Sequence, residues 1–196
     1  ITNNSKSFFL KSTTVYNPTN PSLTFELLDV KRSLFSIPLS YMGYAGYLNP
    51  FTLESQINSK IPILNLVITS LHETAHQMGY ASEKEANFIA YQSAIKNDDP
   101  YIRYAGYSFA LRYFFSELSA IDRSKANHLA KKINSGVLKN FKETSDFWKK
   151  YENPFEVIFE KIYDTFLKAN GEPSGLKSYN EMVGLVINYH KNIEKF

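Results

Sequence analysis

The chain has 196 residues, of which 43% are apolar, and a formal net charge of +3. That length fits one domain with a sizeable core, and the 15 phenylalanines and 14 tyrosines argue against a disordered chain. Because there is no cysteine, disulfide scaffolds and cysteine-ligated zinc modules are excluded. The basic residues are scattered along the sequence, so nucleic acid is not an expected partner.

The first part of the sequence predicts loops and short strands. Residues 1–20 are polar and rich in turn formers, so we expect a flexible lead-in followed by a single domain over residues 21–196. The sequence opens with Ile1 rather than methionine, and we therefore expect a longer protein in which any anchor lies upstream. Residues 27–35 fit the end of a helix followed by a strand. Residues 41–57 are rich in tyrosine and glycine, which favours a turn and a short extended segment.

From Pro62 onward the pattern is helical almost throughout. Pro62 suits the first turn of a helix that runs to about Met78, and Gly79 suits the position just after its end. Ser82 with Glu85 three positions later forms a capping-box pattern, which opens a second helix. Further helices are expected at residues 98–120, 122–134, 137–150, 153–170 and 178–192, the last opened by a capping box of Ser178 and Glu181. The fold class predicted is mainly α, with a small extended region before the helix that starts at Pro62.

That helix carries the sequence His72-Glu73-Thr74-Ala75-His76, which matches the HExxH pattern. Residues four apart share one helix face, so His72 and His76 can bind the same ion, and zinc is the expected cofactor. Glu73 can reach a water activated by that ion without binding the ion itself, and it is the expected general base. The preceding run, residues 63–71, is apolar almost all round, which indicates a buried helix whose polar side chains need a partner such as a metal.

A third protein ligand has to come from another part of the chain. The metzincin pattern HExxHxxGxxH is excluded, because Ser82 stands where its third histidine would be. Residues 83–88 (EKEANF) resemble the second motif of gluzincins, a glutamate followed three and four residues later by alanine and by aspartate or asparagine. That match implies Glu83 as the zinc ligand, and it implies that Asn87 orients a ligand histidine without binding the metal itself. Glu85 is the alternative ligand, although its position in the capping box already explains it.

Longer stretches resemble a known family. Tyr44-Ala-Gly-Tyr-Leu-Asn-Pro-Phe-Thr-Leu-Glu54 and residues 72–88 look like an uncharacterised bacterial membrane-protein family, a domain of unknown function placed among the zincin-like metallopeptidases. Residues 99–107 and 163–171 resemble it as well, so the likeness covers about residues 28–190. The resemblance implies a zincin-like fold, a zinc peptidase of unknown substrate, and upstream hydrophobic helices that anchor the domain at the bacterial cytoplasmic membrane, on its outer side.

Two further expectations concern the substrate. Zincins stabilise the oxyanion with a side chain besides the metal, and the candidates are Tyr179 and Tyr104. Tyr179 begins a predicted helix after a turn, where it can project into a cleft, whereas Tyr104 belongs to an aromatic series that also fits the core. Residues 44–57 precede the motif helix and could form an edge strand that pairs with a peptide, with a plain connecting hairpin as the alternative.

The function that the sequence favours is a zinc-dependent metallopeptidase acting on a peptide or protein. One alternative is an inactive zincin-like interaction module of a membrane complex, against which the presence of the base Glu73 argues mildly. The other is a zinc amidase acting on cell-wall material. The sequence does not separate a peptidase from an amidase, because both need the same water-activating site.

Overall fold

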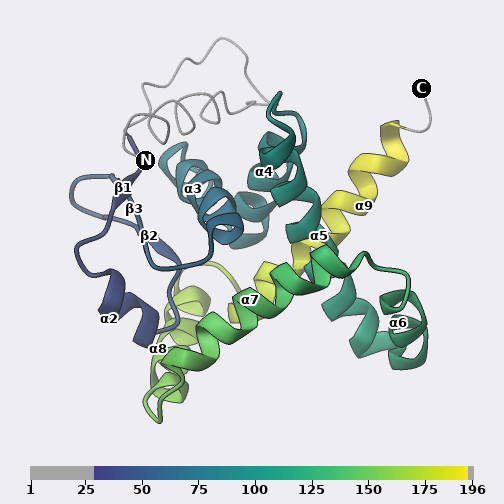
Figure 1. Cartoon of the computed structure of the whole chain (residues 1–196). Coiled ribbons are helices and arrows are strands. Elements are labelled where there is room, and N and C mark those ends of the chain that lie inside the picture. The colour runs from purple at the N-terminus through teal and green to yellow at the C-terminus, as the bar shows by residue number, and fades with distance from the viewer. Residues whose placement is uncertain (1–28, 194–196) are drawn as a thin grey trace.

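The structure, a computed structural model, describes residues 29–193, so the predicted lead-in at residues 1–20 lies outside the described residues. Helices dominate the fold, and a small three-stranded sheet is formed by the first part of the described chain (Figure 1). The prediction of a mainly α-helical chain with a small extended region before the motif helix is therefore confirmed. Within residues 29–193, none of the helices has the length and apolar character needed to cross a bilayer.

The sheet consists of β1 (Lys31–Arg32), β2 (Gly46–Leu48) and β3 (Ser55–Ile57) in the order β1-β3-β2. β1 pairs with β3 in parallel and β2 pairs with β3 in antiparallel fashion, which leaves β2 at one edge. Between β1 and β2 the chain forms α2 (Ser36–Tyr41), which the sequence did not predict. This helix has only 6 residues and no side-chain cap, so it carries neither the periodicity nor the start signal by which helices are found.

The other helices follow the predicted order closely. They are α3 (Ile63–Gln77), α4 (Glu83–Ile95), α5 (Pro100–Ile121), α6 (Arg123–Ala130), α7 (Ser135–Tyr151), α8 (Glu156–Ala169), the 3₁₀ helix η1 (Gly175–Glu181) and α9 (Met182–Ile193). Pro62 is the N-cap of α3, and Gly79 follows the helix with a φ of +92°, a conformation that glycine adopts without strain.

The predicted start of α4 after Ser82 is confirmed, but neither predicted capping box forms its hydrogen bonds. Ser82 does occupy the N-cap of α4, but its hydroxyl makes no cap hydrogen bond, and Glu85 is exposed to solvent. Ser178 is fully buried inside η1, because the chain makes a 3₁₀ helix before α9 and the α-helix begins only at Met182. Glu181 instead accepts hydrogen bonds from Ser174 and from a lysine of α4. At the start of α9 the contact of Glu181 with α4 replaces the local pattern.

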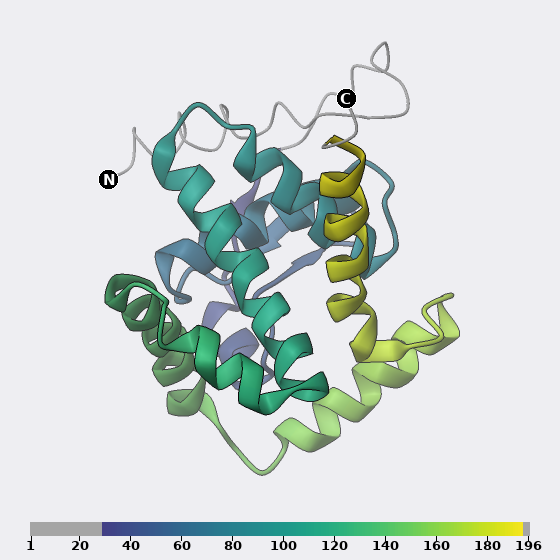
Figure 2. The ribbon, with the colours of Figure 1, turned by 90° about the vertical axis from the view of Figure 1, so that its right-hand side faces the viewer.

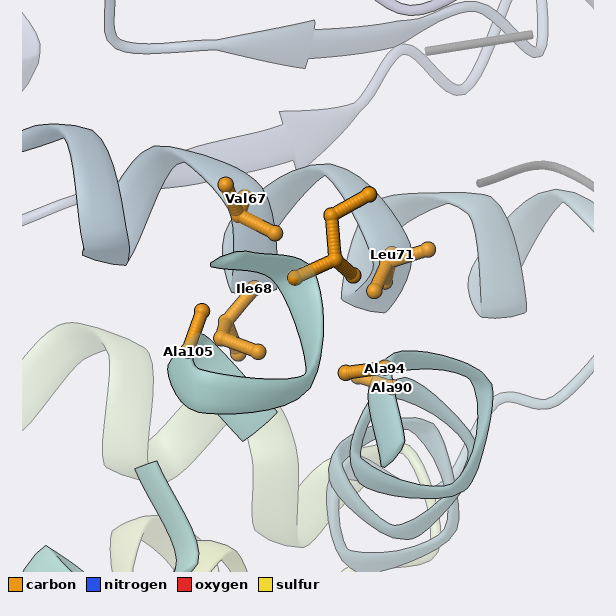
Figure 3. Close-up of a cluster of buried hydrophobic side chains, with 7 residues drawn as sticks. Val67, Ile68, Leu71, Ala90, Ala94 and Ala105 are labelled. Atoms are coloured by element: carbon orange, nitrogen blue, oxygen red, sulfur yellow. The ribbon is translucent and has the colours of Figure 1, made fainter. Parts of the chain in front are cut away.

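The core lies where α3 is covered by α4 and α5, and it places the motif helix in the interior (Figure 3). It is made of large side chains from α3, together with Ile102 of α5, packed against three alanines of α4 and α5. Its members are Val67, Ile68, Leu71, Ala90, Ala94, Ile102 and Ala105. The small side chains let the three helix backbones approach closely. A second cluster joins α9 to α4 and α5, and Figure 2 shows α9 in yellow reached from α8 through η1. The sheet covers α3 through β2 and β3.

A candidate metal centre on α3 and α4

The two histidines of the HExxH sequence point to the same place. His72 and His76 lie one turn apart on α3, and their Nε2 atoms are 3.0 Å from each other. Only 11% and 15% of their side-chain surfaces are exposed. The apolar residues that precede the motif bury the helix, and the histidines are therefore held away from most of the solvent.

Glu83, the first residue of α4, completes a group of three donors. Its Oε2 atom lies 3.1 Å from His72 Nε2 and 3.5 Å from His76 Nε2. In a tetrahedral zinc site with bonds of about 2.0–2.1 Å, two ligand atoms lie roughly 3.3–3.4 Å apart. The three observed separations bracket that value, so the triad has the size of a zinc site. The alternative residue, Glu85, is exposed and is not brought into this group.

The Nδ1 atoms of both imidazole rings, which face away from the triad, each contact a hydrogen-bond acceptor. His76 Nδ1 lies 2.7 Å from the carbonyl oxygen of Tyr80, and His72 Nδ1 lies 2.8 Å from Asn87 Oδ1. The orientation of the Asn87 amide is fixed, since its Nδ2 donates to the carbonyl oxygen of Tyr179 at 3.3 Å. Both Nδ1 atoms must therefore carry the hydrogen, and in the neutral rings both Nε2 atoms present lone pairs to the shared point.

Two lone pairs and a carboxylate oxygen that face one another repel unless a cation sits between them. Among the described residues, Glu83 Oε2 is buried and receives no well-aligned hydrogen bond. A proton can fill this role in the metal-free protein: burial lowers the pKa of His76, but Glu83 raises it to a net value of about 9. Burial alone would raise the pKa of Glu83, but the two histidines hold it well below its usual range. Two imidazoles and one carboxylate are also a donor set that zinc accepts, so the residues fit this metal.

Glu73 lies beside the triad without belonging to it. Its side chain is buried, and burial raises the pKa of its carboxyl group above the usual value, against the opposing effect of the two histidines. The carboxylate packs against β2 at Gly46, where an added Cβ would lie 2.7 Å from Glu73 Oε1. A buried carboxyl group with a raised pKa next to a candidate cation site is suited to accept and release a proton.

Two tyrosines from the C-terminal part of the chain cover the triad. The hydroxyl of Tyr163, on α8, donates to Glu83 Oε1 at 3.1 Å and lies 3.2 Å from the hydroxyl of Tyr179. The ring of Tyr179 is nearly parallel to that of His72, with centroids 6.1 Å apart. Burial raises the pKa of both phenols, so both keep their protons and can donate. The other candidate, Tyr104, bonds to Asn140 of α7 instead of joining these tyrosines.

The comparisons with known proteins identify a family but no activity. The family model described as "Protein of unknown function (DUF3810)" matches residues 1–187. The chain belongs to this family. The expected resemblance to an uncharacterised family is thereby confirmed, whereas the DUF3810 description assigns no fold, metal or reaction. No curated protein and no solved structure matches the chain.

The sequence does not identify two residues, Tyr163 and Gly46, as parts of the candidate site. Tyr163 lies 80 positions after Glu83, and its place in an amphipathic helix resembles that of any half-buried tyrosine. Gly46 lies in a segment rich in tyrosine and glycine, where a glycine is explained equally well by a turn. The available signal is that both residues lie in stretches, 44–54 and 163–171, that carry the family resemblance.

Proposed function

We propose that this chain is a zinc-dependent metallopeptidase or related amide hydrolase of the zincin type, with His72, His76 and Glu83 as the metal ligands and Glu73 as the general base. The observation that carries the proposal is the convergence of two imidazole lone pairs and an unsatisfied buried carboxylate oxygen at one point. Asn87 supports it by fixing the tautomer of His72, as residues behind a ligand histidine do in zinc sites.

The neighbouring residues supply the acid–base part of the proposed reaction. A zinc ion in the triad would act as a Lewis acid, which acidifies water and polarises a carbonyl group. Glu73 accepts a proton from the attacking water as its oxygen bonds to the amide carbon, and it passes that proton to the leaving nitrogen as the C–N bond breaks. Tyr179, a protonated phenol beside His72, is the proposed donor to the oxyanion.

The edge strand β2 offers a place for an extended substrate. Asn49 N donates to Glu54 O at 2.9 Å, which makes these residues a hydrogen-bonded pair across β2 and β3. Such pairs alternate along an antiparallel ladder, so the backbone groups of Gly46 and Leu48 point away from β3. No strand within residues 29–193 pairs with that side of β2. This supports a peptide binding as an added strand, with Gly46 placing it beside Glu73.

The test is metal content and cleavage, measured on protein purified without chelators. We expect about one zinc per chain in the wild type and in Glu73→Gln, and loss of zinc in His72→Ala. The wild type should cleave an unfolded protein substrate, and Glu73→Gln should not, although it retains the metal. A wild type without zinc would refute the metal site. Bound zinc with no cleavage of protein or cell-wall amides would favour the interaction module instead.

The cellular setting is part of the same proposal. We propose a domain on the outer side of a bacterial cytoplasmic membrane, which rests on the family resemblance alone. Protease accessibility of the natural full-length protein in intact cells with a permeabilised outer envelope tests it. Protection of this domain until the cytoplasmic membrane is lysed would contradict the proposal.

A further inference from the structure

The connection between β2 and β3, residues 49–54, exposes two large apolar side chains. Phe51 is 93% exposed and Leu53 is 59% exposed, and only Thr52 separates them in the sequence. A single exposed apolar residue needs no explanation in a folded protein. Two exposed apolar side chains on one short connection indicate a binding surface when that connection is rigid and lies beside a candidate site. We call residues 49–54 the hairpin tip.

The hairpin tip is held in one conformation by its own hydrogen bonds. Asn49 Oδ1 accepts from the backbone N–H of Phe51 at 2.9 Å and of Thr52 at 3.2 Å, and the carbonyl oxygen of Asn49 accepts from Leu53 N at 2.8 Å. Leu53 has a φ of +55°, which is uncommon for a residue with a branched side chain. Strained backbone of this kind is associated with binding sites, where it fixes a side chain in place.

The hairpin tip lies next to the motif helix. Gln77, which follows His76, donates from Nε2 to the carbonyl oxygen of Leu53 at 3.1 Å. At the other end of β2, Gly46 packs against Glu73, four residues earlier on α3. β2 and the tip therefore follow α3 over about one helical turn, roughly 6 Å along its axis, from the proposed base to the far side of the triad.

The direction of an added strand decides which part of a substrate meets the hairpin tip. A peptide antiparallel to β2 would pair with Gly46 next to Glu73, and its preceding residues would run past Leu48 toward the tip. At about 3.3 Å per residue, the tip is reached roughly two to four residues before the scissile bond. Phe51 and Leu53 can then cover a large apolar side chain that would otherwise remain in water.

We propose that Phe51 and Leu53 form an apolar subsite, which selects peptide substrates carrying a large apolar residue on the N-terminal side of the scissile bond. This inference rests on the proposed function. It adds a substrate class to that function: extended chains in which an apolar residue precedes the cleaved bond by a few positions.

Mapping of cleavage sites tests the subsite. The zinc-loaded wild type, Phe51→Ala and Leu53→Asn are each incubated with a peptide library, and the products are sequenced by mass spectrometry. Asparagine tolerates the positive φ of Leu53, so that variant removes the apolar side chain and retains the backbone conformation. Leu34→Ala is the matched control, because Leu34 is 98% exposed and follows β1, at the opposite edge of the sheet.

In the wild type we expect large apolar residues to be enriched two to four positions before the cut. For a peptide with phenylalanine there, kcat/KM should fall about tenfold in Phe51→Ala and in Leu53→Asn, and change less than about twofold for a peptide with alanine. Leu34→Ala should match the wild type. Enrichment only after the cut, or an unchanged profile in both tip variants, would overturn the subsite while leaving the hydrolase intact. A zinc-loaded wild type that cleaves nothing would refute the proposed function, and the subsite with it.

Discussion

The packing of β2 against the motif helix predicts that Gly46 cannot be replaced by alanine without damage to the site. The added Cβ would lie 2.7 Å from Glu73 Oε1, 2.8 Å from Thr69 Cγ2 and 3.0 Å from the carbonyl oxygen of Gln56. Two of these neighbours belong to a buried helix and the third is backbone of β3, so none can move away freely. Overpacking on this scale lowers the free energy of unfolding by about 1–3 kcal/mol. Of the three, the Glu73 carboxylate ends the longest side chain, so we expect it to be the group that is displaced.

Urea unfolding, zinc content and peptide cleavage together measure this effect. Gly46→Ala should lose stability and most of its cleavage activity, and it should retain zinc, because the ligands are on other side chains. The matched control is Gly184→Ala on α9, where an added Cβ meets no atom of residues 29–193 within 4 Å. That change should raise stability by about 0.5–1 kcal/mol and leave activity unchanged. If Gly46→Ala were as stable and active as the wild type, the contact between β2 and Glu73 would not exist as described.

Three further predictions concern the ligands and the scaffold. Tyr163→Phe removes the hydrogen bond to Glu83 Oε1 and should weaken zinc binding about tenfold in a chelator competition, whereas Tyr104→Phe, the same change away from the triad, should leave zinc affinity unaltered. Burial lowers the pKa of His76 but Glu83 raises it to about 9, so zinc at the proposed site would have to displace a proton below that pH. Apparent zinc affinity should therefore rise about tenfold per pH unit from about pH 7 to 9 and then level off. Over the same pH range the metal-free protein should lose the stability that the charged pair of His76 and Glu83 contributes. Affinity independent of pH would refute that protonation state. Asp99→Ala removes the N-cap bond of α5 and should lower the free energy of unfolding by about 1 kcal/mol with no change in zinc content; a loss of zinc would show that the cap acts on the site.

Sequence patterns predict those parts of the fold that depend on local chemistry. The apolar run before His72, the proline at the N-cap and the glycine after Met78 fix α3 almost to the residue, because each acts within one helical turn. The convergence of His72 and His76 follows from helix geometry alone. The preference for Glu83 over Glu85 required a resemblance, since both residues lie in the first turn of α4 and periodicity does not distinguish them.

The remaining features depend on contacts between distant parts of the chain. The sequence from Ser82 to Glu85 fits a capping box, yet the box does not form, because Glu83 takes the inward position in the first turn of α4 and Glu85 faces solvent. Tyr163 reaches Glu83 only because η1 packs against both α8 and α4. A glycine is needed at position 46 because a larger residue would meet Glu73, which lies 27 positions later in the sequence. In each case the partner determines the role of the residue, and the sequence does not identify the partner.

The hydrogen bonds behind His72 show what the candidate metal site needs besides the HExxH sequence. The carbonyl oxygen of Tyr179 orients the Asn87 amide, and Asn87 in turn fixes the hydrogen on His72 Nδ1, which leaves the Nε2 lone pair facing Glu83. Without that arrangement the His72 ring could turn or carry its hydrogen on Nε2, and the donor would be lost. The motif helix provides the spacing of two donors, and α4 provides the third. The 3₁₀ helix near the C-terminal end of the described chain provides the orientation, so the competence of the site depends on segments that are more than 90 residues apart.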